Sequence, residues 1–145
     1  MGTQQILLIV LSVIIVGVAV AVGIQMFNTQ AMNSNRQAVI GDLQTYGTQV
    51  MQYHRTPTSQ GGGGNGGATA YTAATVATFL GWATTSDTTD TGSFTLTTGA
   101  GTVLISGYGT ETGNDPDYGS HDGKVEAELT VTLAGSSPLS TSIIN

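Results

Sequence analysis

The chain has 145 residues and a mass of 14.8 kDa, enough for one small domain and one long element. Only 8% of its residues are charged, and three basic against nine acidic side chains give a net charge of −6. This balance argues against nucleic-acid binding, because neutralising phosphates requires clustered Lys and Arg. The chain contains no Cys, which excludes disulfides, zinc–thiolate sites, iron–sulfur clusters and thiol catalysis.

The chain begins with a long apolar run. Residues 6–24 are interrupted only by Ser12, Gly17 and Gly23, and the first charged side chain is Arg36. At about 1.5 Å per helical residue, the run spans close to 30 Å, the thickness of the hydrocarbon core of a bilayer. We therefore expect a helix that lies in a membrane or in an equally apolar protein bundle.

A cleavable secretory signal is the alternative interpretation of this run. Such a signal needs a positively charged segment before its apolar core, and residues 1–5 offer only the α-amine. The nearest cations follow the run, so the positive-inside rule would place the following domain in the cytoplasm. A Thr/Gly-rich domain without Cys is typical of an external protein instead. A basic leader removed before Met1 would resolve the conflict.

Helical periodicity continues beyond the apolar run with a different pattern. Apolar residues recur at intervals of four and three, at Val39, Leu43, Tyr46, Val50 and Tyr53. This spacing places one apolar stripe on a helix whose other sides are polar. Thr56-Pro57 ends the helix, because proline lacks the amide hydrogen and disfavours helix at the preceding residue. We predict one helix over residues 2–55, about 80 Å long.

A glycine-rich segment, residues 61–67, follows this helix and is predicted to be a flexible, extended connector. It resembles a phosphate-binding loop only in its glycine content, because no Lys-Ser/Thr pair follows it. Beyond the connector, the spacing of apolar residues over 73–80 predicts a short helix, with Gly81 as its C-terminal cap. A strand is the alternative, because the segment has Thr-rich flanks.

Three later segments have the patterns of β-strands. Phe94 and Leu96 alternate with Ser and Thr, residues 103–105 form an apolar run, and residues 125–133 alternate apolar with polar. Three antiparallel strands expose one apolar face, which the helical stripe of residues 39–53 can cover. We expect an α+β fold: a long N-terminal α-helix, hydrophobic in its first half and amphipathic in its second, packed on a small antiparallel β-sheet head domain.

The start of the chain, Met1-Gly2-Thr3-Gln4-Gln5 before the apolar run, resembles the mature N-terminus of prokaryotic type IV pilins and pilin-like filament subunits. In that family a prepilin peptidase removes a leader and exposes an aromatic residue or Met, which is usually N-methylated. The resemblance therefore implies processing and methylation at Met1. It covers residues 1–55 specifically and the β domain in general outline. Gln5 replaces the glutamate of ordinary bacterial pilins, which archaeal pilins and flagellins commonly lack, and the lineage stays open.

This resemblance implies a structural subunit, without enzyme activity or a cofactor, that polymerises through its N-terminal helix into an extracellular type IV pilus-like filament. Its implied partners are further copies of itself, the inner membrane before assembly, the prepilin peptidase and the pilus assembly machinery. Its implied location is the cytoplasmic membrane before assembly and the cell surface afterwards. The alternatives are a minor pilin or type II secretion pseudopilin, and a single-pass membrane-anchored binding domain that never polymerises.

Under this interpretation the chain has three regions: residues 1–25 form the membrane anchor or filament core, residues 26–56 continue the helix, and residues 57–145 form a Gly/Thr-rich globular β domain. Small residues in the first region would let neighbouring helices approach closely. The expected positions in the filament core are Gln5, Gly17, Ala19, Ala21 and Gly23.

Residues suited to catalysis are few. His54 and His121 are the only histidines, and His54 adjoins Arg55 at the predicted helix end, which favours a solvated or capping role. Ser106 lacks the flanking glycines of a nucleophile elbow. We therefore expect no catalytic site.

An acidic loop over residues 111–123 is the one candidate metal site. Asp115, Asp117 and Asp122 supply oxygens of the kind that Ca²⁺ binds, six to eight at a time. Asp115, Asp117 and Glu126 have the spacing of the first, third and twelfth positions of a helix–loop–helix calcium loop, but the glycine required within that loop is absent and Glu126 belongs to a predicted strand. Some pseudopilins bind calcium in an acidic C-terminal loop. A solvated hairpin turn is the alternative.

Overall fold

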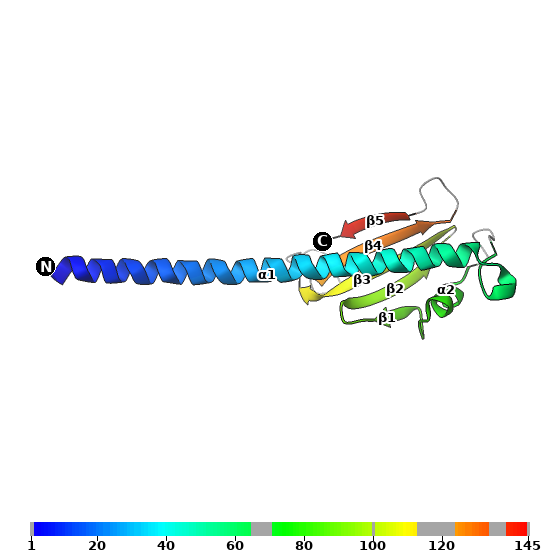
Figure 1. Ribbon diagram of the computed structural model, residues 1–145, viewed down its shortest axis with the longest axis horizontal. Coiled ribbons are helices and arrows are strands. Elements are labelled where there is room, and N and C mark those ends of the chain that lie inside the picture. Colours follow the sequence, from blue (N-terminus) through cyan, green and yellow to red (C-terminus); the bar gives the residue numbers. More distant parts are fainter. Residues whose placement is uncertain (1, 65–70, 100, 113–123, 134–138, 145) are drawn as a thin grey trace.

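A computed structural model describes residues 2–64, 71–99, 101–112, 124–133 and 139–144. The elements, in chain order, are α1 (Gly2–Arg55), a short 3-10 helix (Thr58–Gln60), α2 (Ala73–Leu80), β1 (Ser86–Thr88), β2 (Gly92–Thr98), β3 (Thr102–Thr112), β4 (Lys124–Thr132) and β5 (Leu139–Ile144). Figure 1 shows α1 lying along one face of the sheet and projecting far beyond it toward the N-terminus. The predicted α+β fold is confirmed.

Helix α1 is continuous over 54 residues, as predicted. It ends where Pro57 follows Thr56, and the Thr56 amide closes the last turn by donating to the Gln52 carbonyl at 2.9 Å. Arg55 lies in this last turn, where its positive charge interacts favourably with the helix dipole. Residues 2–55 contain no proline, and glycine is the residue type among them that disfavours a helix most. A helix tolerates glycine at a modest cost in stability.

The sheet is an antiparallel meander in which each strand pairs with the next along the chain, from β1 to β5. It contains the three predicted strands and two more at its edges, β1 and β5, which the sequence analysis did not predict. Strand β1 has only three residues, and β5 shows no clear alternation of apolar and polar residues. Their strand geometry depends on the partners, β2 and β4, that lie beside them.

The core lies between α1 and the inner face of the sheet. Four of the five stripe residues are fully or almost fully buried, and Tyr46 is half-buried, with its ring edge-on to Trp82 and Phe94. Gly47 is buried on the same side of α1. The sheet supplies the other wall of this core through Phe94, Leu96, Val103, Ile105, Ala127, Leu129 and Val131. The predicted helix-on-sheet packing is therefore confirmed.

Helix α1 approaches β3 closely because β3 carries glycine there. A Cβ added to Gly107 would lie 2.8 Å from the Phe94 ring and 2.9 Å from Val39 Cγ1. A Cβ added to Gly109 would overlap the side chain of Asn35. These two glycines thus make room for one turn of α1 to lie against the sheet.

The glycine-rich segment is not an extended connector over residues 61–64, contrary to the prediction. The Gly63 amide donates to the Tyr53 carbonyl and the Gly64 amide to the Thr56 carbonyl, both at 2.8 Å. Gly63 is buried beneath the ring of Tyr71. These bonds satisfy carbonyls that the end of α1 leaves free, so the segment caps the helix. Residues 65–67 lie outside the described residues.

Helix α2 is capped at both ends, and only the C-terminal cap was predicted from the sequence. The Thr72 hydroxyl accepts from the Thr75 amide at 3.3 Å, and the Thr75 hydroxyl accepts from the Thr72 amide. Gly81 has φ 82° and closes the C-terminus. Buried Val76 and Ala77 join the core. The predicted short helix and its glycine cap are confirmed.

Candidate functional site

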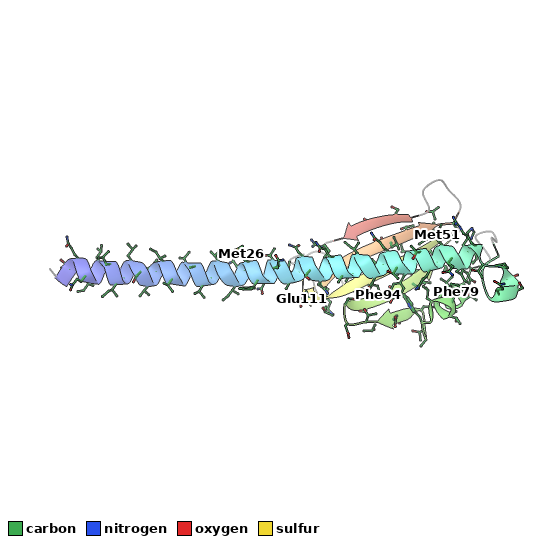
Figure 2. All side chains as sticks on the ribbon, viewed as in Figure 1. Met26, Met51, Phe79, Phe94 and Glu111 are labelled. Carbon is green, nitrogen blue, oxygen red and sulfur yellow. The ribbon has the colours of Figure 1, made fainter. Side chains whose placement is uncertain are left out.

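The candidate functional site is the exposed first half of α1. Every large apolar side chain from Ile6 to Phe27 is exposed, by 49% to 79% of its surface. Figure 2 shows the side chains of the projecting half radiating from α1 on all sides, with no other described helix or strand beside them. The helix is long and apolar enough to cross a membrane, by length and composition. An apolar surface of this extent requires a partner, either lipid or protein.

The predicted small residues form two pairs on this segment. Gly17 and Ala21 are one turn apart, as are Ala19 and Gly23. At about 100° per residue, the two pairs lie on nearly opposite sides of the helix. A Cβ added to Gly17 or Gly23 would meet nothing within 4 Å. The fold of the monomer therefore does not require these glycines, and each pair is open to another helix.

Polar groups within the apolar half are few and uncharged. The Ser12 hydroxyl donates to the Ile9 carbonyl at 2.7 Å, which satisfies it within the helix and suits it to apolar surroundings. Gln5 is exposed one turn from the start of α1, and Met1 lies outside the described residues. One side of α1 near this end is formed by Thr3, Ile6, Leu7, Val10, Leu11 and Ile14, all of them exposed. This side offers a mainly apolar surface to a partner.

Asn35 fastens α1 to the sheet at the level where the helix begins to project. Its amide nitrogen donates to the Thr91 carbonyl at 2.9 Å and to the Thr110 hydroxyl at 3.3 Å. Its amide oxygen accepts from the Glu111 backbone at 3.4 Å. Asn35 thus helps to fix the direction in which the apolar half leaves the head. The sequence analysis missed this residue, although it lies one turn before Val39 on the buried stripe.

Two further polar contacts hold the middle of α1 to the segment around β1. The Thr91 hydroxyl donates to Asp42, and the Tyr46 hydroxyl donates to Asp87 Oδ2 at 3.3 Å. Burial raises the pKa of Tyr46, and the nearby charge of Asp87 raises it further. Tyr46 therefore remains a neutral hydrogen-bond donor at physiological pH.

Of the residues weighed for catalysis, His54 and Ser106 lie apart in the fold, and His121 lies outside the described residues. His54 Nδ1 is 2.6 Å from the Tyr71 hydroxyl at the end of α1. Ser106 lies on the face of the sheet turned away from α1, where its hydroxyl donates to Glu128 at 3.5 Å. On the same outer face, burial raises the pKa of the Tyr108 hydroxyl, as does the charge of Glu126. The structure therefore does not bring His54 and Ser106 together as base and nucleophile.

The predicted calcium ligands Asp115, Asp117 and Asp122 lie outside the described residues. Within the part of the chain that the structure describes, no three His, Asp or Glu side chains form a group that could hold a metal ion. Glu126, the distal member of the calcium-loop spacing, lies in β4 as predicted.

No family model, curated protein or solved structure matches this chain. The architecture itself is pilin-like: a long apolar N-terminal helix continues without a break into a half that packs on an antiparallel sheet. The apolar half is suited to a membrane or to export.

Proposed function

We propose that this protein is the subunit of an extracellular type IV pilus-like filament whose core is built from the exposed half of α1. The supporting observation is that one unbroken helix carries both an apolar surface exposed on all sides and the stripe that fixes it to the sheet. A membrane anchor needs only a flexible connection to its domain. A rigid connection instead gives every subunit the same angle between core helix and head, which a regular polymer requires.

Assembly exchanges lipid around the apolar half for the same half of neighbouring copies. Lipid tails are as apolar as Leu or Val, so the hydrophobic effect gives little drive and close packing decides. The two small-residue pairs, Gly17 with Ala21 and Ala19 with Gly23, lie on nearly opposite sides of α1. Each helix can therefore admit a neighbour on two sides at once, as a bundle requires.

Gln5 should make this assembly less dependent on ionic conditions. In the pilin family a carboxylate at this position pairs with the N-terminal amine of a neighbour, whereas an amide offers hydrogen bonds without an ion pair. The proposal includes the cytoplasmic membrane, the prepilin peptidase and the pilus assembly machinery as partners before assembly, and it assigns no enzyme activity.

A pair of bulky substitutions tests the proposal. Gly17→Leu with Ala21→Leu should leave membrane insertion intact, because leucine suits lipid, yet abolish filaments in electron micrographs of sheared cell-surface material. Val18→Leu with Val22→Leu is the matched control, since it has the same spacing and adds only one methylene at each position. Normal filaments from the Gly17 and Ala21 variant would contradict the packing mechanism.

The parent chain supplies the second arm of this experiment. Abundant filaments made of this chain alone support the proposal. Their absence would favour a minor pilin or secretion pseudopilin, or a membrane-anchored binding domain that does not polymerise.

A further inference from the structure

Between α2 and β2 the chain forms a strap, residues 83–91, that contains the edge strand β1. Figure 1 shows β1 at the edge of the sheet. None of the strap residues is buried, and none of their side chains belongs to the core. The residues on either side are buried: Trp82 precedes the strap, and Gly92 follows it where an added Cβ would overlap the Tyr108 carbonyl. The strap is therefore an exposed segment between two fixed ends.

The strap contacts α1 through polar groups. The Thr91 carbonyl accepts from the Asn35 amide nitrogen at 2.9 Å, and the Thr91 hydroxyl donates to Asp42. Asp87 Oδ2 accepts from the Tyr46 hydroxyl at 3.3 Å. At about 100° per residue, Asn35, Asp42 and Tyr46 lie within about 40° of one another around α1. The contacts therefore follow one line along the helix, over about 16 Å.

Thr91 couples two of these contacts. Its carbonyl and its hydroxyl bond to Asn35 and Asp42, which lie two turns apart on α1. Its hydroxyl also lies 2.7 Å from the hydroxyl of Thr89, and the Thr89 amide donates to the Gly92 carbonyl at 2.8 Å. Movement of this turn away from α1 would therefore break the bonds to Asn35 and Asp42 together.

The connection of the strap to the sheet is short. Strand β1 pairs with β2 over three residues, and the Thr85 carbonyl accepts from the Leu96 amide at 2.8 Å. On the strap itself, the Thr84 hydroxyl donates to the Ser86 carbonyl at 3.0 Å. Segments with few buried apolar contacts and many exposed hydrogen bonds open at a lower free energy than the whole domain. The strap has both properties.

We propose that the strap is a conformational device: it opens while the core stays packed, and its closed state holds the turn of α1 from which the apolar half projects. Asn35 lies in that turn, and the shortest of its three bonds is the one to the strap. Opening leaves Asn35 its longer contacts to Thr110 and Glu111, whereas the stripe that begins at Val39 stays buried against the sheet. The apolar half then gains freedom of direction relative to the head. This inference concerns the single subunit and does not depend on the proposed filament function.

Hydrogen exchange of the full-length subunit in detergent tests whether the strap opens on its own. The Thr89 and Leu96 amides, bonded to the Gly92 and Thr85 carbonyls, report on the strap, and the paired amides of β3 and β4 report on the core. The strap amides should exchange at least about tenfold faster than the core amides, with little dependence on low concentrations of denaturant. Exchange of both sets only through global unfolding would overturn the inference.

A double variant tests the contacts that keep the strap closed. Thr91→Val with Tyr46→Phe removes the two hydroxyls that bond across the strap and α1, with little change of shape. Exchange of the strap amides should accelerate by about tenfold or more, because both lost bonds are to carboxylates, while the core amides keep their rates. Thr97→Val is the matched control, since Thr97 is exposed on the sheet face turned away from α1. Unchanged strap exchange in the double variant would overturn the inference.

Spin labels test the direction of the projecting helix, because the parent chain contains no Cys. Labels at Gln25→Cys and Thr95→Cys, both exposed, give a distance distribution between the helix and the head by pulsed electron paramagnetic resonance. Position 25 lies about 15 Å along α1 from Asn35, so a swing of about 10° moves it by about 2–3 Å. The double variant should broaden the distribution by at least this amount, and Thr97→Val should not. Equal widths in the parent and the double variant would overturn the coupling of the strap to the helix.

Discussion

At the scale of single residues, glycine in β3 sets how closely α1 can lie on the sheet. Gly107 pairs with Phe94 on one side and Ala127 on the other, directly beneath Val39. Val39 and Phe94 are fully buried and cannot move aside into solvent. The small side chains of β3 and β4 at this level therefore complement the larger ones on α1 and β2.

Gly107→Ala should lower the free energy of unfolding by about 1–3 kcal/mol, because its methyl group would press on Val39 and Phe94. The measurement is thermal or urea unfolding of the solubilised subunit, followed by circular dichroism. Gly41→Ala is the matched control, since the same methyl group there meets nothing within 4 Å. Equal stability of Gly107→Ala and the parent would show that α1 is not in close contact with β3.

The hydroxyl of Tyr46 makes stability depend on pH in the alkaline range. Burial raises its pKa in the folded chain above that of the unfolded chain, and the charge of Asp87 adds to this. The folded state then holds the proton more tightly, so stability is unaffected below about pH 10 and falls as pH rises past it. Tyr46→Phe should make this fall less steep in unfolding experiments across alkaline pH. Tyr108, whose pKa is also raised by burial, keeps part of the slope in the variant. An identical slope would contradict the prediction.

At the scale of the elements, α1 contains two halves with opposite relations to solvent. Leu43 is 0% exposed against the sheet, whereas Leu7 is 68% exposed on the projecting half. The same residue type in the same helix therefore contributes to two different properties. Leu43 contributes to the stability of the head, and Leu7 contributes to the exposed apolar surface of the projecting half.

Leu43→Ala should lower the free energy of unfolding of the head by about 2–5 kcal/mol, the usual cost of truncating a buried leucine. Leu7→Ala, the matched control, should leave this free energy unchanged, because the side chain it shortens is 68% exposed on the projecting half. Unfolding of both solubilised variants, monitored by near-ultraviolet circular dichroism of the aromatic cluster around Tyr46, gives the comparison. A similar loss in the two variants would contradict the division of α1 into two halves.

The packed half of α1 is fixed to the head by different means at its two limits. At its C-terminus the backbone folds back through Gly63 and Gly64, which donate to carbonyls of the last turns. At the level where the helix leaves the sheet, Asn35 bonds to Thr91, Thr110 and Glu111 instead. The head therefore fixes α1 both at its C-terminal end and at the turn from which the apolar half projects.

At the scale of the whole molecule, the head is a unit that does not depend on the projecting helix. The buried residues of α1 begin at Val39, and Figure 1 shows the first half of the helix well clear of the sheet. The buried core of the head and the exposed apolar surface therefore belong to different parts of the chain.

Removal of residues 1–28 should yield a soluble monomer with the melting temperature of the full-length subunit in detergent, within a few degrees. The physical reason is that this segment contributes exposed apolar surface and no buried side chain. Size-exclusion chromatography and thermal unfolding measure the two properties. Aggregation of the truncated chain, or a much lower melting temperature, would show that the head depends on the segment removed.

Local patterns in the sequence determined α1, α2 and the three central strands. The stripe from Val39 to Tyr53, the Thr56-Pro57 stop and the Gly81 cap depend on spacing and backbone chemistry within a few residues, so no tertiary information was needed. The exposure of residues 6–24 also followed from the sequence, because a small head has no interior large enough to bury them.

Only the tertiary structure decided which strands form the edges of the sheet and where α1 packs against it. Strands β1 and β5 form because β2 and β4 offer them backbone partners, which no local pattern reveals. From the sequence alone, a glycine within a strand indicates only a weakened or irregular strand. The structure shows that Gly107 leaves the space in which Val39 of α1 packs. The sequence does not distinguish Asn35 from the other polar residues of the helix, because its hydrogen-bond partners Thr91, Thr110 and Glu111 are distant in the chain. These positions depend on residues distant in the chain, and only folding brings them together.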